Sequence, residues 1–296
     1  KFQSIPKSNT QTLKLNRQTN IEHRPSTIDN RISPRTSPNR HIAQSPHRPI
    51  IFLFAFLLSS SLFSQNQANV WYIAGDLTGI DFNTGEPVVI HDLAPLWLNR
   101  SNASMSDSLG NYLFSTCTYF VYDRYGPMQN CEDMIEGGTS GRAIVKWPGR
   151  KNIYYIFNGS WNGGFSYSLV DMTLNEGRGA VTDKNILLDA AWDTFDRVAI
   201  VKKEDTENVW VITRKFTDDA MAAFLVNENG VNPNPVISPM PDREYDPHTD
   251  FGFIKISYDK KYLISSYSPY GNLEICHFNA SNGAFEYMYT ITHAPN

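Results

Sequence analysis

The densest group of residues suited to chemistry lies in one short stretch, which combines four carboxylates with an imidazole: Asp242, Glu244, Asp246, His248 and Asp250. Carboxylate oxygens are the ligands that hard cations such as Ca²⁺ prefer. The stretch precedes an expected strand, in a loop position where binding residues often lie. We interpret it as a candidate binding loop for calcium or another ligand, with a solvated acidic loop as the alternative. No other cofactor is expected.

Catalytic residues are not assigned. Glycoside hydrolysis needs two carboxylates that converge on one bond, and the chain offers many acids without a pattern that pairs them: Asp171, Asp189, Asp193 and Asp196 besides those above. We interpret them as turn or solvated-face residues. The turn Asp107–Asn111 resembles the Asp-box of sialidases, in which the turn itself is structural. The histidines are too scattered for a metal site, so none is predicted.

The three cysteines have two interpretations. Cys117 and Cys131 flank a short expected hairpin, so either a disulfide joins them or both are free buried thiols. Cys276 lies in an alternating strand, where a small buried thiol is expected.

Aromatic residues are frequent, at 13% of the chain. Five of them could line a carbohydrate-binding face: Tyr119, Tyr122, Trp161, Phe165 and Tyr167. Aromatic residues at this density more often form a core, so we interpret the group as packing between sheets.

The elements that position these residues repeat along the chain. Five polar turns close with a glycine after a strand rich in Val, Ile, Tyr and Trp: Gly85, Gly126, Gly179, Gly230 and Gly283. Successive glycines are 41, 53, 51 and 53 residues apart. A period near 50 residues is typical of the four-stranded blade of a β-propeller. The spacing therefore predicts an all-β, propeller-like domain over residues 69–296, with about five four-stranded blade units.

Further strands are expected between these turns, over Tyr112–Ser115, Ala143–Lys146, Ile153–Phe157, Val198–Val201, Val209–Thr213 and Tyr262–Ser266. No segment shows a helical apolar stripe, so helix should be scarce. The strand Val70–Ala74 corresponds to the outer part of a blade. We therefore expect an incomplete ring, in a natural protein that continues beyond Asn296.

The first 65 residues differ from the rest. Residues 1–49 contain nine Lys and Arg against two acids, with little apolar periodicity, which predicts a disordered basic leader. Residues 50–65 are an apolar run of roughly 14 residues that ends in small polar ones, the pattern of a signal peptide and its cleavage zone. A transmembrane anchor, the alternative, needs about 20 apolar residues. We expect a secreted or cell-surface protein with no membrane span after cleavage.

Charge excludes one class of partner. The whole chain carries a formal net charge of −4, and the basic leader leaves the remainder more acidic still. An acidic domain is repelled by the phosphate backbone, so nucleic acid is not expected as a partner.

Several stretches resemble the N-terminal propeller-like region of large secreted Bacteroidetes proteins: Val70–Tyr72, Gly79–Val88, Ser106–Phe114, Asn152–Phe157, Tyr167–Met172 and Val209–Thr213. Ile256–Leu263 is also similar to the Ser-Pro-Asp-Gly-Lys-x-Leu turn of WD-like propellers, with Tyr258 and Lys260 in place of the proline and glycine. The resemblance covers residues 69–292. It implies a propeller fold within surface proteins associated with gliding motility and type IX sorting.

These observations favour a non-catalytic, exported binding or scaffold module of a bacterial surface or adhesive protein, with a surface protein or polysaccharide as its partner. A propeller-fold carbohydrate-active enzyme, either a glycoside hydrolase or a sialidase-like protein, is the alternative. Because one fold hosts many functions, this preference depends on the site.

Overall fold

The computed structural model describes residues 66–73, 78–91, 103–117, 119–134, 141–160, 164–189, 197–215, 219–241, 252–267 and 271–292. All of them belong to the compact unit Leu57–Asn296. The predicted leader over residues 1–49 and the predicted signal peptide over residues 50–65 lie outside the described residues.

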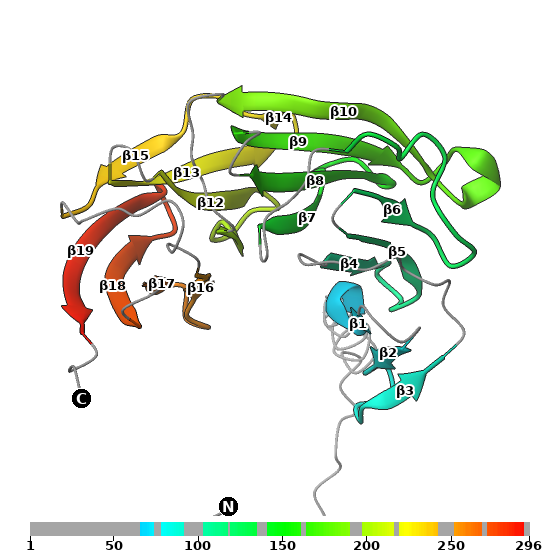
Figure 1. The fold of residues 1–296 in the computed structure, drawn as a ribbon, viewed down its shortest axis with the longest axis horizontal. Coiled ribbons are helices and arrows are strands. Elements are labelled where there is room, and N and C mark those ends of the chain that lie inside the picture. The colour runs from blue at the N-terminus through cyan, green and yellow to red at the C-terminus, as the bar shows by residue number, and fades with distance from the viewer. Residues whose placement is uncertain are drawn as a thin grey trace, which may run out of the picture. The chain divides into compact units, whose positions relative to one another are not determined.

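Five antiparallel sheets follow one another along the chain (Figure 1). Sheet 1 contains β1 (Val70–Ile73), β2 (Thr78–Asp81) and β3 (Val88–Ile90), and sheet 2 contains β4 (Ala103–Ser106), β5 (Tyr112–Thr116) and β6 (Val121–Tyr122). Sheet 3 contains β7 (Arg142–Lys146), β8 (Ile153–Ser160), β9 (Gly164–Asp171) and β10 (Ala180–Asp189). Sheet 4 contains β11 (Val198–Lys202), β12 (Val209–Lys215), β13 (Ala220–Asn227), β14 (Gly230–Val231) and β15 (Val236–Pro239). Sheet 5 contains β16 (Ile254–Ile256), β17 (Tyr262–Tyr267), β18 (Asn272–Asn279) and β19 (Ala284–Ile291).

The arrangement of the sheets is propeller-like. Each sheet is built from strands that follow one another in the sequence and, apart from the last strand of sheet 4, pair in that order. From sheet 2 onward, the first strand of each sheet lies beside the preceding sheet, as in the contacts of β7 with β4, β11 with β7 and β16 with β11. Among the described strands, sheets 1 and 5 share no backbone ladder and no extensive contact. The predicted all-β, propeller-like and unclosed arrangement is therefore confirmed.

The strand count varies around the predicted four. In sheet 4, the short strands β14 and β15 both pair with β13, because Pro233 and Pro235 interrupt the fourth position. In sheet 1, the first residue of β1 pairs with the last residue of β2, next to the turn that follows β2. β1 therefore runs away from that turn, as the second strand of a four-stranded blade does. Sheet 1 thus has the outer strands of a blade, as the sequence predicts.

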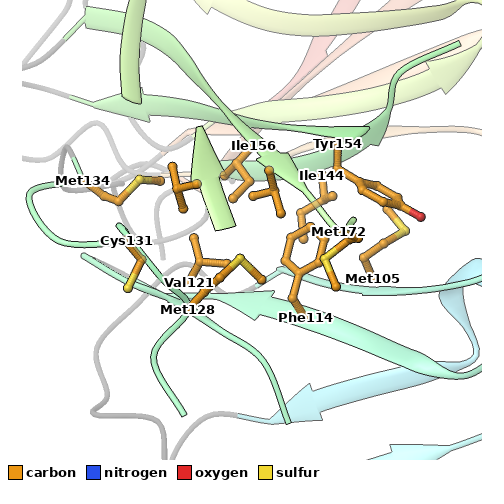
Figure 2. Packing of buried hydrophobic residues seen from close by; sticks show 12 residues of the cluster. Met105, Phe114, Val121, Met128, Cys131, Met134, Ile144, Tyr154, Ile156 and Met172 are labelled. Atoms are coloured by element: carbon orange, nitrogen blue, oxygen red, sulfur yellow. The ribbon is translucent and has the colours of Figure 1, made fainter. Parts of the chain in front are cut away.

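An apolar cluster fills each seam between neighbouring sheets. Alternation along β8 shows how one strand serves two seams, since Tyr154 and Ile156 pack toward sheet 2 while Tyr155 and Phe157 pack toward sheet 4. Figure 2 shows the first of these clusters, with Phe114 of β5 opposite Tyr154 and Ile156. Full burial of one such side chain contributes about 1.5–3 kcal/mol, so the seams stabilise the stack of sheets.

Helix is scarce, as expected. The described residues contain two short 3₁₀ turns, η2 (Asn66–Ala68) and η3 (Asn175–Gly177). Within the same residues, no helix has the length and apolar character needed to cross a bilayer.

Candidate functional site

The five glycine-closed turns lie at one end of the sheets. In a four-stranded meander the turn between the first and second strands and the turn between the third and fourth strands meet at the same end, which we call the turn end. The opposite end, formed by the remaining connections, is the loop end. The predicted turns join β2 to β3, β9 to β10, β13 to β14 and β18 to β19, while the turn at Gly126 follows β6.

An Asp or Asn side chain organises each of these turns in the same way. Its Oδ1 atom accepts a hydrogen bond from the backbone N–H two residues later, at 2.7–3.0 Å, in all five sheets: Asp81, Asp123, Asp171, Asn227 and Asn279. Such Asx turns fix the local backbone. The repeat in the sequence is therefore a repeat of one turn geometry.

Polar contacts link the turns across all four seams. Asn83 Nδ2 donates to the Gly110 carbonyl at 2.9 Å between sheets 1 and 2. Between sheets 2 and 3, Arg178 Nε donates to Asp123 Oδ2 at 2.7 Å. The indole N–H of Trp147 donates to the Glu228 carbonyl across the next seam, and that of Trp210 donates to the Ala280 carbonyl across the last. Hydrogen bonds therefore join the neighbouring turns along the turn end. We call this set of hydrogen-bonded turns the cross-linked rim.

Large side chains project from this rim into solvent. Tyr258 is fully exposed, and Leu109 and Tyr125 are three-quarters exposed. The Arg178 guanidinium lies 5.3 Å from the centre of the Tyr125 ring. None of the three belongs to an apolar cluster of the seams, so these side chains take no part in the packing between sheets.

The turns hold these side chains in place. Asp107 accepts hydrogen bonds from the backbone N–H groups of Leu109 and Asn111. Burial alone would raise the pKa of Asp107, but these bonds and one from the Asn111 side chain outweigh it and lower the pKa below its usual value. Next to Tyr258, a hydrogen bond from the Ser257 hydroxyl lowers the pKa of Asp259. Both carboxylates therefore stay ionised and keep their turns rigid.

Two shallow clefts adjoin the exposed residues. One, of about 250 Å³, lies between sheets 2 and 3 and is lined by Asp123, Tyr125, Met172 and Arg178 among others. The other, of about 400 Å³, lies between the turns of sheets 4 and 5 and is lined mainly by charged side chains, namely Lys202, Lys203, Asp205, Glu207 and Lys260. The rim therefore offers aromatic, guanidinium and ammonium groups along one surface.

The structure does not test the predicted acidic loop. Asp242, Glu244, Asp246, His248 and Asp250 lie outside the described residues, so the proposed calcium or ligand site there stays a prediction. Among the residues that the structure does describe, no group of three or more His, Cys, Asp or Glu side chains is arranged to hold a metal ion.

Most of the aromatic group lies in the seams. Phe165 is completely buried, Tyr122 nearly so, and Tyr167 is half-buried against the rings of Tyr155 and Phe157. Their interpretation as packing between sheets is confirmed. Tyr119 is exposed near the loop end, and Trp161 lies outside the described residues.

The cysteines follow the second of their two interpretations. Cys117, Cys131 and Cys276 are buried thiols outside any disulfide, so the alternative of a Cys117–Cys131 disulfide is not what the structure contains. The reason is the alternation of β6: Cys117 packs with Tyr122 against sheet 1, whereas Cys131 packs with Val121 on the opposite face. Burial raises the pKa of the Cys131 thiol, and that of Cys276 to about 12.

A buried charged group near the loop end is not foreseen from the sequence. Arg214 of β12 is fully buried and pairs with Glu274 of β18 across the seam between sheets 4 and 5. Its Nη2 atom also lies 3.0 Å from Asp219 Oδ1. Arg142 makes a similar cross-seam contact, donating to the Thr116 hydroxyl of sheet 2. These arginines are enclosed by protein, so we interpret them as ties between sheets.

Comparisons with known proteins give distant structural similarities. No family model and no curated protein matches the chain. A protein of Bacteroides fragilis provisionally assigned as a 6-phosphogluconolactonase shares 12% identity, with 77% of this chain and 68% of that one covered and a TM-score of 0.41. A similarly assigned protein of Bacteroides uniformis shares 14% identity, with 75% of this chain and 66% of that one covered and a TM-score of 0.40.

An endo-arabinase of Bacteroides thetaiotaomicron shares 13% identity, with 78% of this chain and 82% of that one covered and a TM-score of 0.36. The chain spans about two thirds of the length of the two lactonase-like proteins. At these scores the similarities carry no functional argument.

Proposed function

We propose that this protein is an exported, non-catalytic binding module whose turn end holds a surface polysaccharide. The observation that carries the proposal is the placement of Leu109, Tyr125 and Tyr258 in solvent on a rim that is cross-linked at every seam. Tyrosine provides a large, rigid and amphipathic contact area at low entropic cost.

Rigidity of the rim supports binding rather than folding as the reason for these side chains. A surface that is ordered before its partner arrives loses little conformational entropy on association. The Asx turns and the seam contacts fix the backbone beneath each exposed ring. An extended polymer is favoured as the partner because Leu109 and Tyr125 lie on turns of sheet 2 and Tyr258 lies on a turn of sheet 5. The clefts beside them are shallow.

The binding test uses gel electrophoresis of the folded protein through soluble polysaccharides, from neutral dextran to acidic polygalacturonate. We expect at least one polymer to retard migration. The double variant Tyr125→Ala, Tyr258→Ala should weaken retardation at least about tenfold, the loss typical of two central aromatic contacts.

Tyr119→Ala is the matched control, since it removes an exposed tyrosine near the opposite end and should leave retardation unchanged. The rim is not a polysaccharide site if no polymer retards the wild type. The same conclusion follows if the double variant and Tyr119→Ala both bind as tightly as the wild type. Release of new reducing ends from a retarding polymer would show that the protein is an enzyme.

Export is tested separately, by the intact mass of the protein recovered from its source cells. We expect a mature amino terminus near Gln65, because residues 50–65 have the pattern of a signal peptide. An uncleaved chain among the cytoplasmic proteins would contradict export while leaving the binding test unaffected.

A further inference from the structure

Equivalent rows of side chains can be followed from sheet to sheet. In sheet 3, Tyr154, Val170 and Val181 face one another across three strands and are buried against sheet 2. We call such a row, which faces the preceding sheet, a back row. The row one residue further on, which includes Tyr155 and Leu169, faces sheet 4. We call that a forward row. Each internal seam joins a forward row to a back row.

The back row of sheet 1 has no described sheet against it. Val70 faces Asp81 at the start of an Asx turn, as Ile153 faces Asp171 in sheet 3, so the equivalent row is Trp71, Ile80 and Val89. Trp71 is 54% exposed and Val89 is 55% exposed. Both are apolar residues at positions that are buried in sheet 3.

The forward row of sheet 5 is exposed in the same way. The residues that face one another across its strands are Ile264, Ile275 and Tyr289. Ile264 is 37% exposed and Tyr289 is 50% exposed. The opposite face of this sheet is buried against sheet 4 through Leu263, Cys276 and Phe278. The apolar forward row therefore has the chemistry of a seam without the second sheet.

We infer that these two rows form a fifth seam, between two copies of this chain, with the forward row of sheet 5 packed on the back row of sheet 1 of a second molecule. This contact would continue the packing within the chain, because one forward-to-back packing mode already joins every pair of consecutive sheets. The interface uses different patches on the two copies, so it is heterologous and leads to closed rings or open chains.

The test is sedimentation of the full chain over a range of concentrations. It compares wild type with single variants that each place one charge in one of the two rows. Wild type should associate, and Ile264→Asp and Val89→Asp should each weaken the association at least tenfold. Tyr289→Asp serves as a second variant of the sheet 5 row, should Ile264→Asp fold poorly. Leu187→Asp is the control, because Leu187 is 47% exposed on sheet 3 and belongs to neither row.

Mixing gives the decisive readout. Ile264→Asp keeps an intact sheet 1 and Val89→Asp keeps an intact sheet 5, so an equimolar mixture should regain dimers but form nothing larger. Every variant keeps residues 50–65, so any association through that apolar run is the same in all of them. A monomeric wild type, association that survives both charges, or a mixture without dimers would overturn the inference.

Discussion

Glu274 belongs to a buried ion pair between two sheets. Its carboxylate is 4% exposed and pairs with a guanidinium that is fully buried. Removing one partner of a buried pair leaves a charge poorly compensated and costs about 3–5 kcal/mol. We therefore expect Glu274→Ala to lower the free energy of unfolding by that amount in urea titrations. Glu207→Ala, which removes the exposed pair with Lys202, should cost less than about 1 kcal/mol; equal effects would refute the cross-seam role.

Asp107 should make stability depend on pH. Its folded-state pKa is lowered, so its contribution is present above the unfolded-state pKa, about 3.9, and is lost as the pH falls through the lower folded value. Asp107→Ala should cost about 1 kcal/mol at pH 7 through lost hydrogen bonds. Urea titrations at pH 7, 5 and 3 should show that the gap to wild type is smaller at pH 3 than at pH 7, and a gap that stays constant would contradict the assigned role of Asp107.

At the residue scale, the sequence predicts roles better than partners. Asp171 is a carboxylate that the sequence assigns to a turn, and it does organise one, since it accepts a hydrogen bond from the Thr173 N–H. The exposure of Tyr258 is not predicted from the sequence, although a signal is present. An aromatic residue there replaces the proline of a turn that needs no large side chain. The pair of Arg214 and Glu274 gives no such signal, since 60 residues separate them.

Among the elements, the third-to-fourth turn of sheet 5 shows why glycine recurs. Gly283 has φ +81° and a Cβ there would lie 2.8 Å from the Trp210 ring. Gly85 has φ +87° with no atom within 4 Å of such a Cβ. Gly85→Ala should cost about 1–2 kcal/mol for the left-handed backbone alone, and Gly283→Ala about 1–3 kcal/mol more through overpacking.

Thermal or urea unfolding of these two variants separates the contributions. If both lose the same stability, the contact of the turn with Trp210 has no energetic role, and the glycine repeat reflects backbone conformation only.

The elements were predictable where their causes are local. An Asx turn depends on atoms two residues apart, and strand alternation on neighbouring residues, so the five turns and most strands agree with the sequence. The seam contacts join atoms far apart in the chain, with Trp147 and Glu228 separated by 81 residues. Nothing in the sequence pairs them, which is why the cross-linked rim and its exposed side chains emerge only from the structure.

For the whole molecule, we expect stability to be graded along the stack of sheets. Sheets 3 and 4 are packed on both faces, whereas sheets 1 and 5 each have one exposed apolar row. In stacked units that contact only their neighbours, the terminal units open first. Amide hydrogen exchange should therefore be slowest in β8, β9, β12 and β13. Equal protection in β1, β2, β17 and β18 would indicate that the terminal sheets are covered in solution.

The order of the sheets has a consequence for synthesis. Every described sheet is built from strands that are neighbours in the sequence, and each sheet after the first packs on the sheet before it. In the export proposed above, a chain that emerges from a translocation pore amino terminus first would complete one seam before the next sheet has appeared, because each seam joins segments that are close in the sequence. Each completed seam makes backward sliding costly. Folding on the far side of the pore would then act as a ratchet that draws the rest of the chain through.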